Sequence, residues 1–252
     1  MLRHAIAGSL GLAAAALFAL PASANGFESW AAIVVAGDFR AHSGEPSEVF
    51  DNGRRDITKA LTRLGFAASH VKQFSVRPDS DMETHPLTSD IDTIRTEFRK
   101  LAQQGSGGCL VYVTSHGSPD GVLIGNTLVS PRTIAQMVDQ SCSDRMTVVI
   151  VSACFSGVFV PALQSPNRMI MTAARRDRTS FGCGEANVYT FFDQCVLESL
   201  PQSRDFPALG TKVRDCVAAR EIMEGATPPS EPQVDIGYNI AQSLSVYAFS
   251  GN

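Results

Sequence analysis

Apolar residues follow two different spacings along the chain. Apolar runs predict buried strands at residues 30–36, 109–114, 147–151 and 169–173, and a weaker strand is predicted at about 67–74. Apolar residues at every third or fourth position predict helices between and after these strands. Buried strands that alternate with amphipathic helices are typical of a mostly parallel sheet covered on both faces. We therefore predict an α/β fold, a three-layer αβα sandwich with a mostly parallel sheet.

Start and stop signals bound the predicted helices. Serine is a favoured helix cap, proline is favoured at the first helical position, and glycine commonly ends a helix. The predicted helices are one with Ile57 and Leu61 that ends at Gly65, one capped by Ser89, one that begins at Ser130-Pro131, one with Val188, Phe191, Phe192, Cys195 and Val196 on one face, and one that begins at Pro207.

The remaining segments are polar, irregular or rich in turn-forming residues. Residues 40–50 show no period and contain Gly44 and Pro46, which predicts a loop. The other expectations are a small hairpin at 121–129 with Asn126 in its turn, a polar loop at 175–185, an irregular Pro-rich segment at 227–232 and a short strand near Val246.

The first 24 residues have the layout of a secretory signal peptide. Arg3 precedes an apolar run, which is followed by Pro21 and the small triplet Ala22-Ser23-Ala24. A membrane anchor is the alternative, but the apolar run is short for a span. We expect cleavage after Ala24, a single α/β domain at 25–252, no stable membrane insertion after cleavage, and a periplasmic or secreted location.

Charge and cysteine spacing narrow the function classes. The formal net charge is −4, and no run of Lys or Arg occurs, which argues against a nucleic-acid or anionic-membrane partner. The six cysteines include no C-x-x-C, and no close His pair is present, so we expect no metal site. In an oxidising compartment the disulfides to test first are Cys109 with Cys142 and Cys195 with Cys216, which leaves Cys154 and Cys183 over.

Candidate chemistry follows two of the predicted strands directly. The strand 109–114 runs into Ser115, His116 and Gly117, and the strand 147–151 runs into Ser152, Ala153 and Cys154. Neighbouring parallel strands place their carboxyl ends side by side, so the imidazole and the thiol can meet there. The alternatives are that the cysteine is a small buried apolar residue and that the histidine belongs to a turn.

A Cys–His pair at this position suits acyl transfer. The imidazole of His116 would remove the proton of the Cys154 thiol and later protonate the leaving amine. The backbone N–H groups of Gly117 and Cys154 would stabilise the oxyanion, at about 3 kcal/mol per donor. No G-x-S-x-G elbow is present, so serine-hydrolase chemistry finds no support.

The two strand ends resemble the legumain-type cysteine peptidases, within the wider clan that includes caspases and gingipains. Further matches are Thr172-Ala173-Ala174, then Thr179-Ser180-Phe181, and then residues 189–193. TAARRDRTSFGCG together with the later SEPQ (Ser230 to Gln233) looks like the bacterial branch of the family, and the resemblance spans about 30–233. It implies a caspase-like fold and a cysteine endopeptidase that acts on peptide or protein substrates without a cofactor, through an acyl-enzyme on Cys154.

The resemblance also implies residues for the pocket that binds the P1 side chain of the substrate. These are Arg54, Ser152, Ser180 and Asp193. Ser152 departs from the family, because legumains have Glu there, and an Arg-bearing pocket would also accept Asp by bidentate pairing. The expected cleavage is therefore after Asp or Asn. Without the resemblance, Arg54 is a solvated charge, Ser180 a turn residue and Asp193 an acid on a helix surface.

Two other functions use the same residues or the same fold. A transpeptidase or ligase would let an amine compete with water for the same thioester. A non-catalytic binding or scaffold protein on the caspase-like fold would use none of this chemistry. The sequence indicates no particular oligomeric state.

Overall fold

The computed structural model describes Met1 and residues 26–249, with the side chain of Val246 excepted, so the expected signal peptide lies outside the described residues. Its main sheet has seven strands in the order β10-β9-β8-β4-β1-β2-β3, and all neighbours are parallel except β10 and β9. The strands are β1 (Ala31–Ala36), β2 (Val71–Ser75), β3 (Leu87–Thr88), β4 (Cys109–Thr114), β8 (Thr147–Ser152), β9 (Arg168–Thr172) and β10 (Gln233–Ile236).

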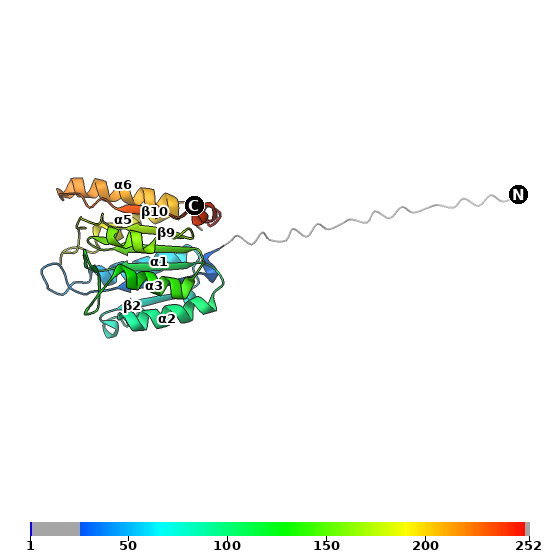
Figure 1. Ribbon diagram of the computed structural model, residues 1–252, viewed down its shortest axis with the longest axis horizontal. Coiled ribbons are helices and arrows are strands. Elements are labelled where there is room, and N and C mark those ends of the chain that lie inside the picture. Colours follow the sequence, from blue (N-terminus) through cyan, green and yellow to red (C-terminus); the bar gives the residue numbers. More distant parts are fainter. Residues whose placement is uncertain (2–25, 250–252) are drawn as a thin grey trace.

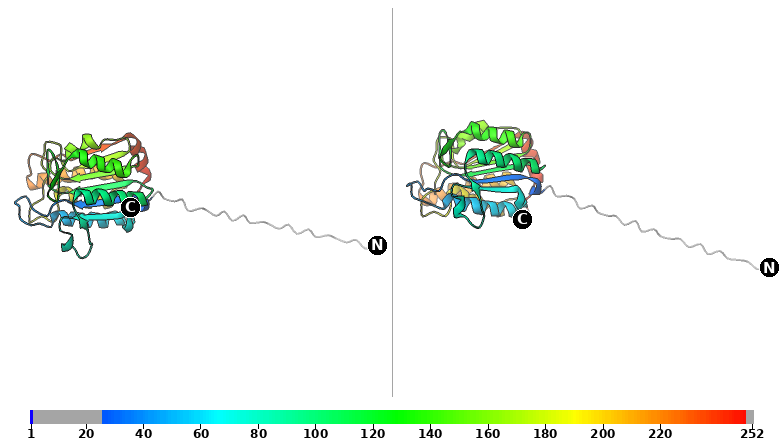
Figure 2. Two further views of the ribbon diagram at one scale, coloured as in Figure 1. Left: turned by 60° about the horizontal axis from the view of Figure 1, so that its bottom comes forward. Right: turned by 90° about the horizontal axis from the view of Figure 1, so that it is seen from below.

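Helices cover both faces of this sheet (Figure 1, Figure 2). One face packs against α1 (Val49–Arg63), α5 (Phe191–Ser199), α6 (Phe206–Glu224) and α7 (Tyr238–Ser243). The other packs against α2 (Ile91–Gln104), α3 (Pro131–Cys142) and α4 (Val160–Leu163). β1, β4, β8 and β9 are buried along their whole length, because side chains of both faces enter one of the two cores. The predicted three-layer αβα sandwich is confirmed.

A small second sheet follows β4. It consists of β5 (Gly117–Ser118), β6 (Gly121–Ile124) and β7 (Thr127–Val129), in that order, and all its pairs are antiparallel. The predicted hairpin at 121–129 is confirmed as β6 and β7, with Asn126 between them.

Two disulfides connect helices to neighbouring elements of the fold. Cys109–Cys142 joins the start of β4 to the end of α3, and Cys195–Cys216 joins α5 to α6. Cys142 therefore lies at the end of a helix, five residues before β8 begins at Thr147. Both predicted pairings are present, and Cys154 and Cys183 are free thiols.

Two helix starts differ from the sequence predictions. α1 begins at Val49, inside the predicted loop 40–50, because Val49 and Phe50 are buried and hold the first turn without a side-chain cap. Asp90 caps α2 in place of Ser89, since its carboxylate accepts hydrogen bonds from the N–H groups of Asp92 and Thr93.

Two further predictions, Val188 on a helix face and a short strand near Val246, are wrong. Val188 is 59% exposed and lies in the loop before α5, whose cap is Thr190. Val246 lies in a short 3₁₀ helix, and the late strand is β10, which pairs antiparallel with β9 at the sheet edge. No helix of the described residues is long and apolar enough to cross a membrane.

The register of the central strands sets the position of the candidate chemistry. β4 and β8 pair from Cys109 and Thr147 at one end to Thr114 and Ser152 at the other. The segments that follow the two strands therefore leave the sheet at the same edge and side by side, as the sequence predicted.

Candidate active site

Cys154 lies in a tight turn directly after β8. The next residue, Phe155, has a left-handed backbone (φ 57°), and its N–H donates to the carbonyl of Arg178 at 2.8 Å. The hydroxyl of Ser156 then accepts a hydrogen bond from the N–H of Ala174. These contacts tie the turn to the segment after β9 and hold the half-buried thiol at the strand end.

His116 is held by the segment that connects β1 to α1. Its Nε2 lies 2.9 Å from the carbonyl oxygen of Arg40, and its ring meets the ring of Phe50 edge to face at 5.1 Å. A carbonyl accepts only from an N–H, so Nε2 is the protonated nitrogen of the neutral ring. This leaves the lone pair on Nδ1 for a proton from the thiol.

Gly117 packs directly against the nucleophile's backbone. A Cβ at this position would lie 2.1 Å from the carbonyl oxygen of Cys154, so no larger residue fits. Gly117 opposes Val122, and the N–H of Leu123 donates to the carbonyl of His116. In the alternating antiparallel ladder, Gly117 therefore forms a pair without hydrogen bonds, and its N–H points away from β6.

The N–H of Cys154 donates to no group among residues 26–249. Together with the N–H of Gly117 it is available to a developing oxyanion, which is the role predicted for both.

Three polar groups of Ser180 lie close to the sulfur atom of Cys154. Its N–H lies 3.3 Å from Sγ, its carbonyl oxygen 3.5 Å and its hydroxyl 3.6 Å. The N–H points a hydrogen-bond donor at the sulfur, and the carbonyl oxygen can accept the thiol hydrogen. The structure thus brings this predicted pocket residue next to the nucleophile.

Asp193 is the buried centre of a hydrogen-bond cluster. Its carboxylate accepts from the hydroxyls of Tyr112 at 2.7 Å and Thr114 at 2.5 Å. Burial raises the pKa of Asp193 and outweighs the opposing effect of these hydroxyls. Burial, followed by the nearby Asp193 charge, also raises the pKa of Tyr112 well above its usual range.

Ser152 reaches the same cluster through Thr190. The Ser152 and Thr190 hydroxyls lie 3.2 Å apart, and the Thr190 hydroxyl accepts the N–H of Asp193 at 3.0 Å. Gly53 of α1 packs against the carboxylate, because a Cβ there would lie 2.7 Å from Asp193 Oδ2. Two of the predicted pocket residues, Ser152 and Asp193, therefore lie in one cluster at the ends of β4 and β8.

Arg54 lies outside this cluster. Its side chain is completely buried, and its guanidinium contacts none of the other predicted pocket residues in the described chain. Instead it donates to Asp51 at 3.0 Å, Gln73 at 2.6 Å and Thr84 at 2.9 Å, and it also pairs closely with Asp81. Arg54 is thus not the solvated charge of the alternative interpretation, and its role in the substrate pocket stays a prediction.

Sequence reasoning missed the partners of the predicted residues. Arg40 acts through its carbonyl, which every residue type possesses, so no sequence signal marks it. Tyr112 and Thr114 belong to the β4 run CLVYVT, where the pattern indicates only burial. Thr190 is recognisable as a helix cap, but its contact with Ser152 depends on the fold.

A second free thiol lies near the nucleophile. Cys183 packs against a small buried cluster that contains Phe50, the residue in contact with His116. Burial and, secondly, the charge of Cys154 raise the pKa of Cys183.

Alkylation is therefore expected to modify Cys154 before Cys183. At pH 7 the raised pKa keeps Cys183 protonated, and its reactivity should increase only as the pH approaches that raised pKa. Limited treatment with iodoacetamide followed by peptide mapping by mass spectrometry measures the order. A Cys183→Ser control should leave the labelling rate of Cys154 unchanged, whereas equal rates at the two thiols would contradict the expectation.

One group of possible metal ligands occurs among the described residues, formed by Cys195, Glu198 and Cys216. Both of its sulfur atoms are joined in a disulfide and are not available as thiolates. The chemistry at Cys154 is that of a thiol, an imidazole and backbone N–H groups.

Comparison with known proteins decides the family. The family model of the Peptidase C13 family matches residues 79–227, more than half of the chain and a segment that includes His116, Cys154 and Asp193 but not Arg54. The chain belongs to the Peptidase C13 family. This is the legumain family, and the chain is accordingly a cysteine peptidase, as the strand-end motifs predicted.

The fold of this C13 peptidase is similar to the crystal structure of caspase-1 from Spodoptera frugiperda. The TM-score is 0.60 at 17% sequence identity, over 84% of this chain and 88% of that chain. At this identity the likeness shows the fold alone, and it confirms the predicted caspase-like architecture. No curated protein matches the chain.

Proposed function

We propose that this C13-family peptidase is an exported endopeptidase of the family's bacterial branch, which cleaves after Asn or Asp through a thioester on Cys154. The observation that carries the proposal is the strand-end geometry. β4 and β8 pair up to Thr114 and Ser152, so the residues that follow them stand side by side, and Gly117 touches the carbonyl of Cys154.

Each group of the site has a defined role in the proposed mechanism. His116 Nδ1 takes the thiol proton, and the sulfur attacks the carbonyl carbon of the scissile bond to form a tetrahedral oxyanion. The N–H groups of Gly117 and Cys154 stabilise that oxyanion. The imidazolium returns its proton to the leaving amine as the C–N bond breaks, and the same imidazole then activates a water that hydrolyses the thioester. The Arg40 carbonyl keeps the ring oriented throughout.

Asp193 supports a preference for Asn. Its carboxylate oxygens accept hydrogen bonds from the Tyr112 and Thr114 hydroxyls, and the Ser152 and Thr190 hydroxyls also lower its pKa as hydrogen-bond partners, so the carboxylate acts as an acceptor throughout. A P1 amide donates to such an acceptor, whereas a P1 carboxylate is repelled by it unless one of the two acids is protonated. The guanidinium of Arg54 is already held by two aspartates, so it offers no counter-charge for a P1 Asp.

The ratio of cleavage after Asn to cleavage after Asp is expected to fall as the pH is lowered. Because the pKa of Asp193 is raised, its protonated fraction grows as the pH falls from 7 to 5, and the repulsion of a P1 Asp weakens. The substrate's own carboxyl, with a pKa of about 3.9, stays mostly ionised over this interval. We expect the ratio of kcat/KM for P1 Asn to kcat/KM for P1 Asp to decrease about tenfold. A coupling of one pKa unit between the Asp193 carboxyl and the P1 carboxyl corresponds to that factor.

A peptide library scanned at P1, incubated with the mature chain at several pH values, measures this ratio and tests the proposed activity itself. The Asp193→Asn variant is the control and should show a ratio that does not vary over the interval. Failure to cleave any P1 residue would contradict an endopeptidase. A pH-independent ratio in the unaltered chain would instead remove Asp193 from P1 recognition. Addition of a nucleophilic peptide, with mass spectrometry of the products, separates hydrolysis from ligation.

Export is supported by the sequence and by the cysteines. The Arg3, apolar run and Ala22-Ser23-Ala24 pattern is that of a cleaved signal peptide. Two disulfides are typical of proteins that fold in an oxidising compartment, such as the periplasm. We therefore assign the activity to the periplasm or the secreted fraction.

A further inference from the structure

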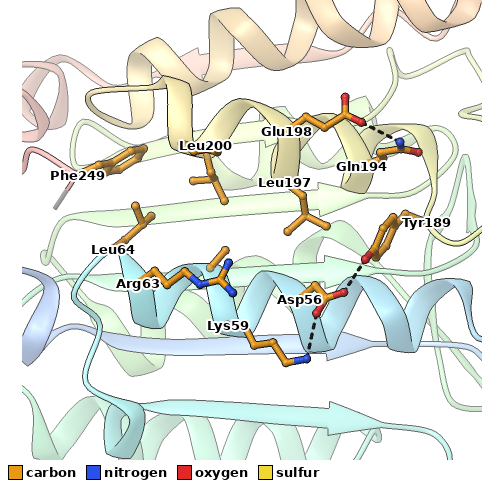
Figure 3. Close-up of a pocket in the computed structure, with 12 residues that line it drawn as sticks. Asp56, Lys59, Arg63, Leu64, Tyr189, Gln194, Leu197, Glu198, Leu200 and Phe249 are labelled. Carbon is orange, nitrogen blue, oxygen red and sulfur yellow. Dashed lines mark hydrogen bonds and ion pairs between the residues drawn. The ribbon is translucent and has the colours of Figure 1, made fainter. Parts of the chain in front are cut away.

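A groove runs along the surface between α1 and α5. Its volume is about 540 Å³, within the range of sites for small ligands, and neither His116 nor Cys154 lines it. Figure 3 shows residues of α1 along one side, residues of α5 along the other, and Phe249 at one end. The two ends of the groove differ in chemistry.

One end of the groove is apolar. Leu64, Leu200 and Phe249 line it and belong to the core cluster on this face of the sheet, with exposed fractions of 7%, 5% and 5%. The half-buried Leu197 of α5 extends this surface toward the middle of the groove. An apolar body of modest size would find contact on several sides here.

The other end is polar, and its charges are paired. Asp56 pairs with Lys59 at 3.2 Å and accepts a hydrogen bond from Tyr189. Glu198 is bound by Gln194 at 2.8 Å and lies 3.5 Å from Arg220. Figure 3 shows the contacts of Asp56 with Lys59 and Tyr189 and the contact of Glu198 with Gln194.

Arg63 is the exception among the charged groove residues. Within residues 26–249 it makes no ion pair and no side-chain hydrogen bond. Figure 3 shows its side chain lying along the groove, with the guanidinium between the apolar end and the Asp56 end. Arg63 is exposed, so its planar guanidinium can present two N–H donors to an incoming carboxylate in a bidentate pair.

We propose that this groove binds a small monocarboxylate with an apolar tail. The carboxylate pairs with Arg63, and the tail lies against Leu200 and Phe249. The opposite orientation is excluded by Asp56, whose pKa is lowered because the hydrogen bonds from Tyr189 and Lys59 outweigh its burial, so that it remains an anion. The site is independent of the peptidase chemistry proposed for Cys154.

Titration of the mature chain with decanoate, below its micellar concentration, tests the proposal by isothermal calorimetry. We expect saturable binding at one site and no binding of decylamine, whose cation Arg63 repels. The Arg63→Gln variant should bind decanoate about ten- to a hundredfold more weakly, the range for loss of a charge-assisted hydrogen-bond pair. Arg214→Gln, an exposed arginine on α6, is the matched control and should leave the affinity unchanged.

A second variant tests the apolar half of the site. Leu197→Asn should weaken decanoate binding severalfold and leave the affinity for acetate, which has no tail, unaltered. Equal affinities in the unaltered chain and Arg63→Gln would overturn the proposal, as would the absence of saturable decanoate binding. Arg63 is exposed and Leu197 is half-buried, so thermal unfolding of each variant verifies that the fold persists.

Discussion

Replacement of Cys154 by alanine is expected to lower kcat for peptide cleavage by about a thousandfold or more, with the fold unchanged. The substitution removes one sulfur atom, whose polar contacts within residues 26–249 are with Ser180, so little native packing is lost. It removes the only atom that can form the proposed thioester, and deletion of a nucleophile abolishes the covalent route entirely. Turnover of a fluorogenic peptide with Asn at P1, together with circular dichroism, measures both consequences.

Cys183→Ala is the matched control for this experiment. It deletes the neighbouring free thiol, which the proposed mechanism does not use, and should retain activity within about threefold. Full activity in Cys154→Ala would reject Cys154 as the nucleophile. Loss of activity in both variants, with the fold intact, would show that the thiol pair acts as a unit and that the assignment to one cysteine is wrong.

The central strands were predictable because both of their faces are buried. β4 and β8 are continuous apolar runs, and such runs fit neither an amphipathic helix nor a half-exposed strand. β10 shows the limit of this signal. Its residues Gln233–Ile236 are half-buried or exposed at the sheet edge, and its place depends on pairing with β9, a contact that no local pattern encodes.

The start of α1 was unpredictable for a related reason. Glu48 precedes the helix without a capping hydrogen bond, so the usual start signal is absent. Val49 and Phe50 are held by burial against Ala36 and Cys183, residues from other segments of the chain. Tertiary packing therefore decides where this helix begins.

The catalytic pair His116 and Cys154 could be predicted from the sequence because strand register alone brings the two residues together. The hydrogen-bond cluster around Asp193 could not be predicted in this way. Asp193 meets Tyr112 and Thr114, which are 81 and 79 residues away in the chain, and their spacing has no relation to a helical or strand period. The resemblance to legumains identified Asp193, but only the fold shows that four hydroxyl-bearing side chains surround it.

Arg54 illustrates why a motif does not fix the role of a side chain. Asn52-Gly53-Arg54-Arg55 offers two adjacent arginines, and consecutive helix residues point in directions about 100° apart. The helix turns Arg54 inward toward β2 and the loop that contains Asp81, whereas Arg55 remains partly exposed.

Arg54→Met is consequently expected to destabilise the protein by about 3–5 kcal/mol, the usual cost of removing one partner from a buried ion pair. The substitution removes the buried cation between Asp51 and Asp81, whose exposed fractions are 4% and 8%, and leaves them the longer ion pairs to the more exposed Arg77 at 3.6 Å and Arg55 at 3.3 Å. Burial alone would raise the pKa of Asp81, but hydrogen bonds from Thr84 and Arg54 outweigh it and hold the pKa far below its ordinary value. Denaturant unfolding measures the loss, and Arg55→Met, whose side chain is 22% exposed, should cost clearly less.

The same two variants also separate the structural role of Arg54 from a role in specificity. If Arg54 only holds α1 to β2 and the Asp81 loop, then Arg54→Met at a temperature where it stays folded should keep the P1 preference of the unaltered chain. A variant of undiminished stability that loses cleavage after Asp would show instead that Arg54 binds the substrate carboxylate. Stability and P1 preference thus respond oppositely under the two roles, because one guanidinium cannot both remain bound to Asp51 and Asp81 and neutralise a third carboxylate.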